Sequence, residues 1–263
     1  MAENYREAAT RISQDAGTFL REKLRSAHTI AFKGEINLVT EADKISEEII
    51  TTQIHKLFPN HDILAEEFTH TRTGSDFKWI IDPLDGTTNY AHGYPVFCVS
   101  LALQKLGEII LGVIYNPMLD EIFVAEKGEG AFLNGRKIHV SNTIKATEGL
   151  MATGFPYDIR EDAKNNLSYF NKMILKVRGI RRAGSAALDL AYVAAGIFDG
   201  FWELKLSPWD TAAGWLMVEE AGGIVTDIKG IDYYLESQSI LASNGKIHDK
   251  MIAILDGPDP AIL

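Results

Sequence analysis

The stretch that decides the fold is Trp79-Ile80-Ile81-Asp82-Pro83-Leu84-Asp85-Gly86-Thr87-Thr88-Asn89-Tyr90. Its apolar start predicts a short strand with Asp82 at the carboxyl end, where open α/β sheets usually place ligands. Pro83 restricts the backbone, so Asp82 and Asp85 can converge. Gly86 permits a left-handed turn, and the amides after it can begin a helix that favours an anion. The segment therefore offers oxygens for a cation and donors for a phosphate.

Two further acids stand at the ends of predicted elements. Glu66 closes a short apolar run, and Asp210 opens a helix-like stretch that ends in glycines. Each acid also has an ordinary structural interpretation: Asp85-Gly86 is a common turn, Glu66 a solvated strand end and Asp210 a helix cap. Taken together with Asp82, the four acids predict a site for hard cations.

These motifs resemble the signature motifs of the inositol monophosphatase family, and the resemblance spans most of the chain. Leu84 replaces the commonest isoleucine, but the family uses only the backbone carbonyl there. The residues that carry the resemblance are Ala65-Glu66-Glu67, Asp82 to Tyr90, Trp209-Asp210-Thr211-Ala212-Ala213-Gly214, Glu220-Ala221-Gly222-Gly223, Lys33 and Asp43 of the amino-terminal motif, Gly184-Ser185-Ala186 and Glu203.

The resemblance implies a shared-ligand metal site. Glu66, Asp82 and the Leu84 carbonyl would hold the first ion, and Asp82, Asp85 and Asp210 the second, with Asp82 bridging. Two or three Mg²⁺ ions are expected, with Mn²⁺ as a possible substitute. Oxygen ligands without histidine also favour Mg²⁺, Mn²⁺ or Ca²⁺ over zinc.

The remaining site residues follow from the same resemblance. The catalytic residues are Glu66, Thr87 and Asp43: the Thr87 hydroxyl, bonded to Asp43, and Glu66 would orient or deprotonate the water. The Gly86 and Thr87 amides would bind the phosphate, and Ala186 and Glu203 the alcohol. The full substrate-binding set is Gly86, Thr87, Asp85, Ala186, Glu203 and Asp210.

Two of these residues have a competing interpretation. Asp43 also fits the capping box Thr40-Glu41-Ala42-Asp43 at the start of a helix. Glu203 could equally be a solvated strand residue.

The implied reaction is Mg²⁺-dependent hydrolysis of a phosphate monoester by direct attack of water, with inositol 1-phosphate giving myo-inositol and phosphate. Inhibition by lithium and a homodimer are also implied. Two alternatives stay open: a related sugar or nucleotide phosphatase such as a fructose-1,6-bisphosphatase, and a non-catalytic regulatory binding protein on the same fold.

Composition fits an enzyme that acts on a small molecule. The chain has 263 residues and a formal net charge of −10, and its only basic run is Arg178-Gly179-Ile180-Arg181-Arg182, so neither nucleic acid nor a membrane is an expected partner. Cys98 is the single cysteine and is predicted to be a buried thiol, in keeping with the cytoplasm. Neither a signal peptide nor an apolar run long enough for a membrane span is recognised.

The periodicity predicts one α/β (α+β) domain over 1–263, with a sheet-rich lobe at 1–145 that carries the metal motif and an α/β lobe at 146–263. The resemblance implies the layered α-β-α-β-α sandwich of the inositol monophosphatase and fructose-1,6-bisphosphatase type. Helices are predicted around Ala8 to Leu20, Ile45 to Leu57, Asp162 to Lys176, Ala186 to Ala195 and Thr211 to Ala221. Strands are predicted at Asp62 to Glu66, Phe77 to Asp82, Val96 to Tyr115 as a hairpin, Glu121 to Glu126, Gly149 to Thr153, Gly200 to Leu204, Gly223 to Asp227 and Ser239 to Ala242. The hairpin is predicted to turn near Leu106-Gly107, and a further turn is predicted at Asn134-Gly135.

Overall fold

The computed structural model describes residues 4–24, 30–32 and 38–258. The helices within these residues are α1 (Tyr5–Lys23), α2 (Glu41–Leu57), α3 (Thr87–Ala91), α4 (Leu167–Ile174), α5 (Ala186–Ala194), α6 (Pro208–Glu220) and α7 (His248–Asp256), with a 3-10 turn at Ala146–Glu148. The strands are β1 (Ile30–Phe32), β2 (Leu38–Thr40), β3 (Asp62–Ala65), β4 (His70–Thr71), β5 (Phe77–Asp85), β6 (Cys98–Lys105), β7 (Glu108–Asn116), β8 (Glu121–Glu126), β9 (Gly130–Leu133), β10 (Arg136–Ile138), β11 (Leu150–Thr153), β12 (Gly179–Arg181), β13 (Gly200–Leu204), β14 (Ile224–Thr226) and β15 (Ser239–Ser243).

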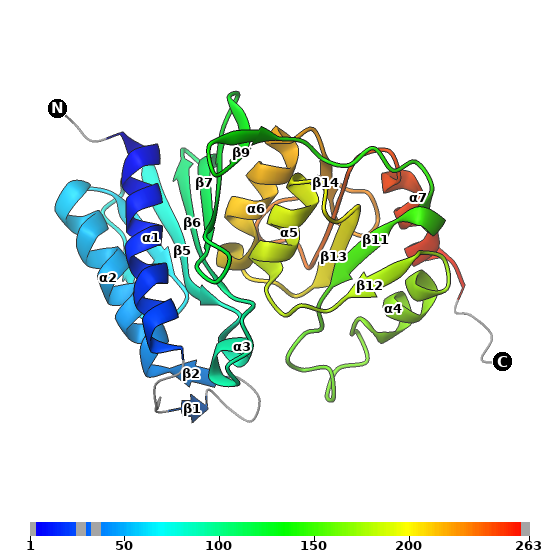
Figure 1. Cartoon of the computed structure of the whole chain (residues 1–263), viewed down its shortest axis with the longest axis horizontal. Helices are drawn as coiled ribbons and strands as arrows, with labels where there is room; N and C mark the ends of the chain where they lie inside the picture. Colours follow the sequence, from blue (N-terminus) through cyan, green and yellow to red (C-terminus); the bar gives the residue numbers. More distant parts are fainter. Residues whose placement is uncertain (1–3, 25–29, 33–37, 259–263) are drawn as a thin grey trace.

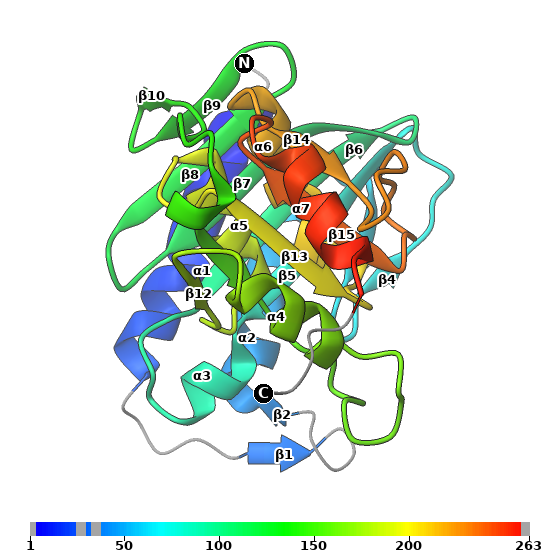
Figure 2. The same ribbon diagram turned by 90° about the vertical axis from the view of Figure 1, so that its right-hand side faces the viewer.

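The elements form five layers, as Figure 1 shows. Helices α1 and α2 cover the outer face of an eight-stranded sheet, and α5 and α6 lie between this sheet and a five-stranded one. The turned view in Figure 2 places α4 and α7 in front of the smaller sheet, on its outer face. The predicted α-β-α-β-α sandwich is therefore confirmed.

The larger sheet has the order β10-β9-β8-β7-β6-β5-β3-β4. Its neighbours pair antiparallel except β3 and β5, which are parallel, with Ala65 opposite Ile81. Parallel strands end at the same edge of a sheet, so the next residues along each strand, Glu66 and Asp82, become neighbours. Strand pairing alone thus brings together two acids that are sixteen positions apart in the sequence.

The smaller sheet has the order β12-β11-β13-β15-β14. Strand β13 pairs in parallel with β11 and antiparallel with β15, so it is central, and all five of its residues are buried. Glu203 lies near the carboxyl end of this strand, on the side of the molecule that also carries the end of β5. A carboxylate in a fully buried strand is unusual and marks this position as more than a surface residue.

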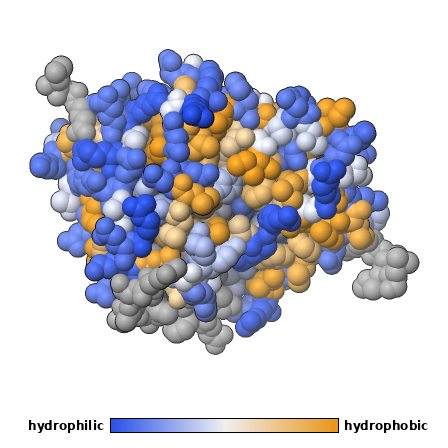
Figure 3. Space-filling view, viewed as in Figure 1, coloured by the Kyte–Doolittle hydropathy of each residue, from blue (hydrophilic) through white to orange (hydrophobic). Residues whose placement is uncertain are grey.

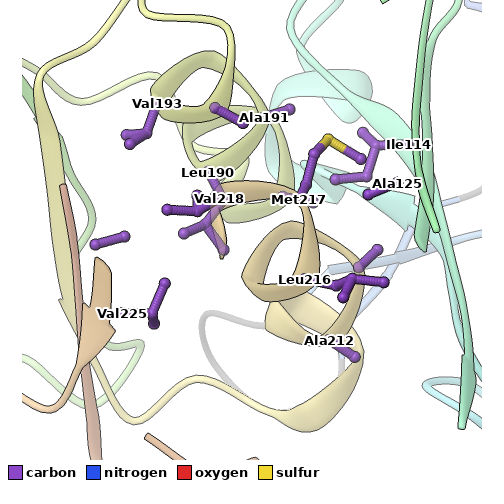
Figure 4. Close-up of a cluster of buried hydrophobic side chains, with 14 of the residues drawn as sticks. Ile114, Ala125, Leu190, Ala191, Val193, Ala212, Leu216, Met217, Val218 and Val225 are labelled. Carbon is purple, nitrogen blue, oxygen red and sulfur yellow. The ribbon is translucent and has the colours of Figure 1, made fainter. Parts of the chain in front are cut away.

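Apolar packing holds the two middle helices between the sheets. Figure 4 shows Leu190 of α5 beside Val218 of α6, with Ile114 of the larger sheet on one side and Val225 of the smaller sheet on the other. These four side chains belong to one buried cluster. Because α5 and α6 share their core with both sheets, the loops at their amino-terminal ends are fixed relative to β5 and β13.

The surface view in Figure 3 shows mostly hydrophilic residues over α1 and α2, and hydrophobic residues gathered near the middle of the same face. None of the described helices is long and apolar enough to cross a membrane.

Most predicted elements are present, and the differences have physical causes. Strand β5 runs on to Asp85 instead of ending at Asp82. Helix α4 begins at Leu167, not near Asp162, because Asp158 and Asp162 pair with Lys205 and hold the preceding segment as a loop. Helix α6 begins at Pro208, before the predicted Thr211, since proline suits the first helical position. Helix α7 was not predicted.

Candidate active site

A bulge in β5 turns two acids toward one face. Asp82 pairs with Ser100 of β6 and Asp85 with Cys98, so three residue steps on β5 match two on β6. In a regular strand, residues three apart point to opposite faces of the sheet. The extra residue of a bulge reverses this parity, and Asp82 and Asp85 come to the same side. Pro83, which donates no backbone hydrogen bond, stands inside this irregular segment.

Burial and mutual repulsion disturb the ionisation of these acids. Asp82 is 1 % exposed, and burial raises the pKa of its carboxyl well above the usual value, with the charges of Glu66, Asp85, Asp210 and Asp43 adding to the effect in that order. Burial, then the charges of Asp85 and Glu66, likewise raises the pKa of Asp210. Five acids thus crowd into one region of low dielectric, where a cation would relieve the repulsion.

Hydrogen bonds from the protein hold one oxygen of each of three carboxylates. The Leu84 amide donates to Asp82 Oδ1 at 3.0 Å, the Ser207 amide donates to Asp210 Oδ2 at 2.6 Å, and Asp85 Oδ2 accepts from the Ser185 hydroxyl at 2.6 Å. These bonds fix the position of each side chain.

The Ala187 amide also donates to Asp85 Oδ2, at 2.8 Å. This bond ties the end of β5 to the amino terminus of α5, whose dipole stabilises a carboxylate. Asp85 therefore links the larger sheet to α5, which also packs against the smaller sheet.

The donor set fits a hard divalent cation. It consists of carboxylate and carbonyl oxygens, the ligands that Mg²⁺ and Ca²⁺ prefer. Among the described residues, no three acidic, histidine or cysteine side chains stand close enough to hold one ion as they are. Small side-chain rotations of acids that already surround one cavity would be needed to close the coordination shell.

The Thr87 hydroxyl lies within hydrogen-bonding distance of two acceptors. Its Oγ1 lies 3.2 Å from Asp43 Oδ2 and 3.1 Å from the Leu84 carbonyl oxygen. A hydroxyl has one proton, so it can donate to only one of them at a time. If a cation binds the Leu84 carbonyl, the proton goes to Asp43, and a lone pair of Thr87 is directed elsewhere. The structure thus brings together the predicted Thr87 and Asp43.

Gly86 permits the tight turn between β5 and α3, where the backbone lies close to Val96. It has φ +101° and precedes α3. A side chain there would also place its Cβ 2.9 Å from the Val96 carbonyl oxygen. Both the left-handed backbone and the lack of space require glycine. Its amide and that of Thr87 come from a segment that lines the larger of the two cavities described below.

Glu47 of α2 holds the turn that follows Glu66. Its buried carboxylate accepts bonds from the amides of Glu67, Phe68 and Thr69 at 2.9, 3.0 and 2.8 Å, and from the Thr69 hydroxyl at 2.7 Å. The Glu66 amide in turn donates to the Ile81 carbonyl at 3.2 Å. The backbone around Glu66 is therefore anchored on both sides.

We expect Glu47→Ala to lower the free energy of unfolding by about 2–4 kcal/mol, because several buried donors would lose their acceptor. It should also weaken the binding of a divalent cation such as Mg²⁺, since the Glu66 turn would loosen. Urea unfolding and a metal titration measure the two effects. Glu47→Gln keeps one acceptor oxygen and serves as the matched control with smaller losses. A Glu47→Ala protein with unchanged stability would contradict the anchoring role.

Two adjoining cavities open beside these acids. The larger, of about 270 Å³, and the smaller, of about 100 Å³, share part of their walls, including Asp85, Phe155, Tyr157, Glu203 and Asp210. The larger is also lined by Glu66, Asp82, Leu84 and Thr87, and the smaller by Arg182, Ser185, Ala186 and Asp189. The acids thus stand in the first cavity, next to a second one with other polar groups.

Glu203 connects the two cavities. It is 8 % exposed, and its carboxyl covers Gly154 so closely that a Cβ there would lie 2.1 Å from Oε1. Burial, then the charge of Asp85, raises the pKa of Glu203 to about 8. Asn166 holds the backbone beside Glu203 in place. Its side chain donates a hydrogen bond to the Gly154 carbonyl at 2.5 Å and accepts one from Trp202 Nε1 at 2.7 Å. The view of Glu203 as a solvated strand residue is therefore wrong.

Asp210 caps a helix in addition to lining the cavities. It caps α6 through the Ser207 amide, and it lines both cavities, so the helix-cap interpretation is correct but incomplete. Cys98 is buried, as predicted, with its Sγ 3.8 Å from Asp85 Oδ2. Lys33 of the amino-terminal motif lies outside the described residues.

The residues that line the cavities but were not identified from the sequence include Phe155, Tyr157, Arg182 and Asp189. Asp189 had a usable signal, because it is the one acid in the apolar run Ala186 to Ala195. Phe155 and Tyr157 come from a loop that only tertiary structure brings over the site.

Comparisons with known proteins agree with this geometry. The model of the inositol monophosphatase family matches residues 1–257. The chain is 44 % identical over 230 residues to the inositol-1-monophosphatase of Mesorhizobium japonicum, covering 87 % of this chain and 86 % of that protein. It is 40 % identical over 254 residues to the Nus factor SuhB of Pseudomonas aeruginosa, covering 94 % of each. The solved structure of inositol monophosphatase from Anabaena matches with a TM-score of 0.88 at 43 % identity, covering 97 % of this chain and 96 % of that one. The chain belongs to the inositol monophosphatase family.

Proposed function

We propose that this protein is a Mg²⁺-dependent phosphatase that hydrolyses inositol 1-phosphate to myo-inositol and phosphate. The observation that carries the proposal is the convergence of Glu66, Asp82, Asp85 and Asp210 on one cavity, next to a second cavity lined by the buried Glu203. The larger cavity suits metal ions and a phosphate. The smaller cavity suits the alcohol part of an ester.

The acids would hold the metal ions as the family resemblance implies: Glu66, Asp82 and the Leu84 carbonyl on one side, and Asp82, Asp85 and Asp210 on the other. Bound Mg²⁺ would supply an acidified water and charge stabilisation at the leaving oxygen. Two or three ions are proposed, with Mn²⁺ able to substitute.

The chain's own groups complete the reaction. Thr87, donating its proton to Asp43 at 3.2 Å, orients the attacking water with a lone pair, and Glu66 accepts a proton from that water. The Gly86 and Thr87 amides bind the phosphate oxygens and keep the phosphorus in line with the water. The Ala186 amide and Glu203 bind hydroxyls of the alcohol, so the leaving group departs from the smaller cavity.

The test is a phosphate-release panel over inositol 1-phosphate, fructose 1,6-bisphosphate and 2′-AMP, with Mg²⁺ and with EDTA. The expected result is Mg²⁺-dependent release with the highest kcat/KM for inositol 1-phosphate. Activity that persists in EDTA would refute the metal mechanism. A clear preference for the sugar bisphosphate or the nucleotide would favour the related sugar or nucleotide phosphatases. Inhibition by Li⁺ is expected through competition for a metal position.

A substitution next to Glu203 separates alcohol recognition from phosphate chemistry. Gly154→Ala would push the Glu203 carboxyl out of place, because a Cβ there meets its atoms at 2.1–2.4 Å. We expect about a tenfold fall in kcat/KM for inositol 1-phosphate relative to p-nitrophenyl phosphate, which offers no hydroxyls. Glu203→Gln, which keeps the shape but cannot ionise, should shift the ratio in the same direction. Equal losses on both esters in both variants would remove Glu203 from substrate selection.

A second candidate function is a non-catalytic regulatory role, which the relatives called Nus factor SuhB favour. The two roles are compatible in one protein. An inactive Asp82→Asn protein that still restores the cellular function of a deletion strain would separate the regulatory role from catalysis.

The protein is further proposed to act in the cytoplasm as a homodimer. The single buried cysteine suits a reducing compartment. Exposed hydrophobic residues such as Ile197, together with those near the middle of the face in Figure 3, are in keeping with self-association. Light scattering checks the oligomeric state.

A further inference from the structure

Asp189 is a buried acid on α5 that the proposed mechanism does not use. It is 2 % exposed, it lines the smaller cavity, and its Oδ1 has no hydrogen-bond partner among the described residues. Its neighbours Leu188 and Leu190 on the helix are also buried, so this part of α5 lies inside the molecule. A buried polar atom without a partner destabilises the fold.

A purely structural role does not account for Asp189. It stands in the first turn of α5, where the helix dipole favours an acid. However, that stabilisation is smaller than the destabilisation caused by a buried, unsatisfied carboxyl. The Ser185 hydroxyl already accepts a bond from the Leu188 amide at 3.4 Å, so the helix has its own cap. A ligand that enters the cavity would supply the partner that this oxygen lacks.

The surroundings of Asp189 indicate which ligand fits. Burial, then the charges of Glu203 and Asp85, raises the pKa of Asp189 well above its usual value, and Arg182 offsets part of this effect. The carboxyls of Asp189 and Glu203 are therefore close enough to repel each other, although they come from α5 and β13. Two neighbouring acids disfavour a second phosphate and suit uncharged hydroxyl groups, which can donate to one acid and accept from a protonated one.

We propose that Asp189 is a further specificity-determining residue, which binds a hydroxyl of the alcohol beside Glu203, so that the site selects phosphate esters of polyols with at least two free hydroxyls. Rotation about the Cβ–Cγ bond of an aspartate exchanges its two oxygens readily. A hydroxyl in the cavity can therefore supply the partner that the carboxyl lacks. This inference rests on the proposed phosphatase function, because it assigns the smaller cavity to the alcohol.

The test compares Asp189→Leu, similar in shape but apolar, with Asp189→Asn, which can still donate and accept a hydrogen bond. We expect Asp189→Leu to lower kcat/KM for inositol 1-phosphate about tenfold more than for p-nitrophenyl phosphate, as the loss of one substrate hydrogen bond predicts. Asp189→Asn should recover most of that loss. The melting temperature of Asp189→Leu should not fall, because an unsatisfied buried carboxyl is removed.

Asp199→Asn is the matched control, because Asp199 is also a buried acid but lies outside both cavities and accepts bonds from the Leu150 amide at 2.7 Å and the Ser141 hydroxyl at 2.5 Å. This variant should lose stability and keep the wild-type substrate ratio. An Asp189→Leu protein with the wild-type ratio would overturn the inference while leaving the phosphatase proposal intact.

A binding measurement separates the two proposals. In Ca²⁺, which we expect to support little turnover because its coordination is looser than that of Mg²⁺, inositol 1-phosphate should raise the melting temperature of the wild type more than inorganic phosphate does, and Asp189→Leu should lose this difference. If the wild type released no phosphate from any ester, the phosphatase proposal would fail, and the same binding difference would still support Asp189. A wild-type shift that is no larger for the ester than for phosphate, or one that Asp189→Leu retains, overturns the inference about Asp189.

Discussion

Asp82→Asn is expected to reduce Mg²⁺-dependent phosphate release by a factor of about 10³ or more while the protein stays folded. Asp82 is the proposed bridging ligand, so one change would disturb both metal positions. Each ~1.4 kcal/mol of lost transition-state stabilisation lowers the rate tenfold, and a disrupted metal pair removes several kcal/mol. Steady-state rates at saturating Mg²⁺, with circular dichroism as the check on folding, measure the effect.

The fold should survive because the asparagine oxygen can still accept the bond from the Leu84 amide at 3.0 Å. Asp62→Asn is the matched control. Asp62 lies at the start of β3, at the other end of the strand from Glu66, and accepts hydrogen bonds from the Thr73 amide at 2.6 Å and the Thr73 hydroxyl at 2.8 Å. This control should keep its activity. A well-folded Asp82→Asn protein with near wild-type rates would remove the metal assignment.

Local patterns in the sequence were sufficient to predict most of the fold. The hairpin turns at Leu106-Gly107 and Asn134-Gly135 were predicted from turn chemistry, and in the structure all four residues have positive φ. Helices α1 and α2 followed from their apolar spacing. The order of the layers came from the family resemblance, because periodicity does not say which face of a sheet a helix covers.

The errors arose where distant residues decide the local structure. Helix α4 was predicted to be too long because Lys205, about forty residues later, bonds to Asp158 and Asp162 at 2.7 and 2.6 Å and keeps that segment out of the helix. Helix α7 was missed, although Met251 and Leu255 have the i, i+4 spacing of a buried helix face.

The acids of the site and their convergence were predicted from the sequence, but the structural cause of the convergence was not. Motifs located Asp82 and Asp85 next to each other, yet only the register shift against β6 turns them to the same face. Similarly, Glu66 meets Asp82 because β3 and β5 are parallel. Asp189 was overlooked because its environment depends on β13 and on a cavity that no short stretch of sequence describes.

The second large effect concerns stability and its dependence on pH. Burial raises the pKa values of Asp82, Asp85 and Asp210 in the folded protein above the value of 3.8 expected in the unfolded chain, and the charges of neighbouring acids add to the effect at Asp82 and Asp210. A group whose pKa is raised on folding contributes stability below its unfolded pKa and loses it as the pH rises through its folded pKa. In EDTA, the stability contribution of these acids should therefore decrease from about pH 4 toward neutral and alkaline pH.

Mg²⁺ should restore this stability at neutral pH, because it binds the ionised acids of the native state only. At 100 times its dissociation constant, one ion adds ~2.7 kcal/mol if the unfolded chain does not bind it. For a chain of this size that corresponds to a rise in melting temperature of about 5–10 °C. Thermal unfolding at pH 5 and pH 8, with EDTA or Mg²⁺, measures the effect, which should be larger at pH 8.

Asp210→Asn distinguishes the metal role of this residue from its role as a cap. The amide oxygen can still accept the bond from the Ser207 amide at 2.6 Å, so the cap on α6 is kept while one charge of the acid cluster is lost. The variant should be more stable than the wild type in EDTA at pH 8, by about 1–2 kcal/mol, since it removes a buried like charge. Its Mg²⁺-induced rise in melting temperature should be clearly smaller. If the rise matched that of the wild type, Asp210 would act as a helix cap alone, and the second metal position would need another ligand.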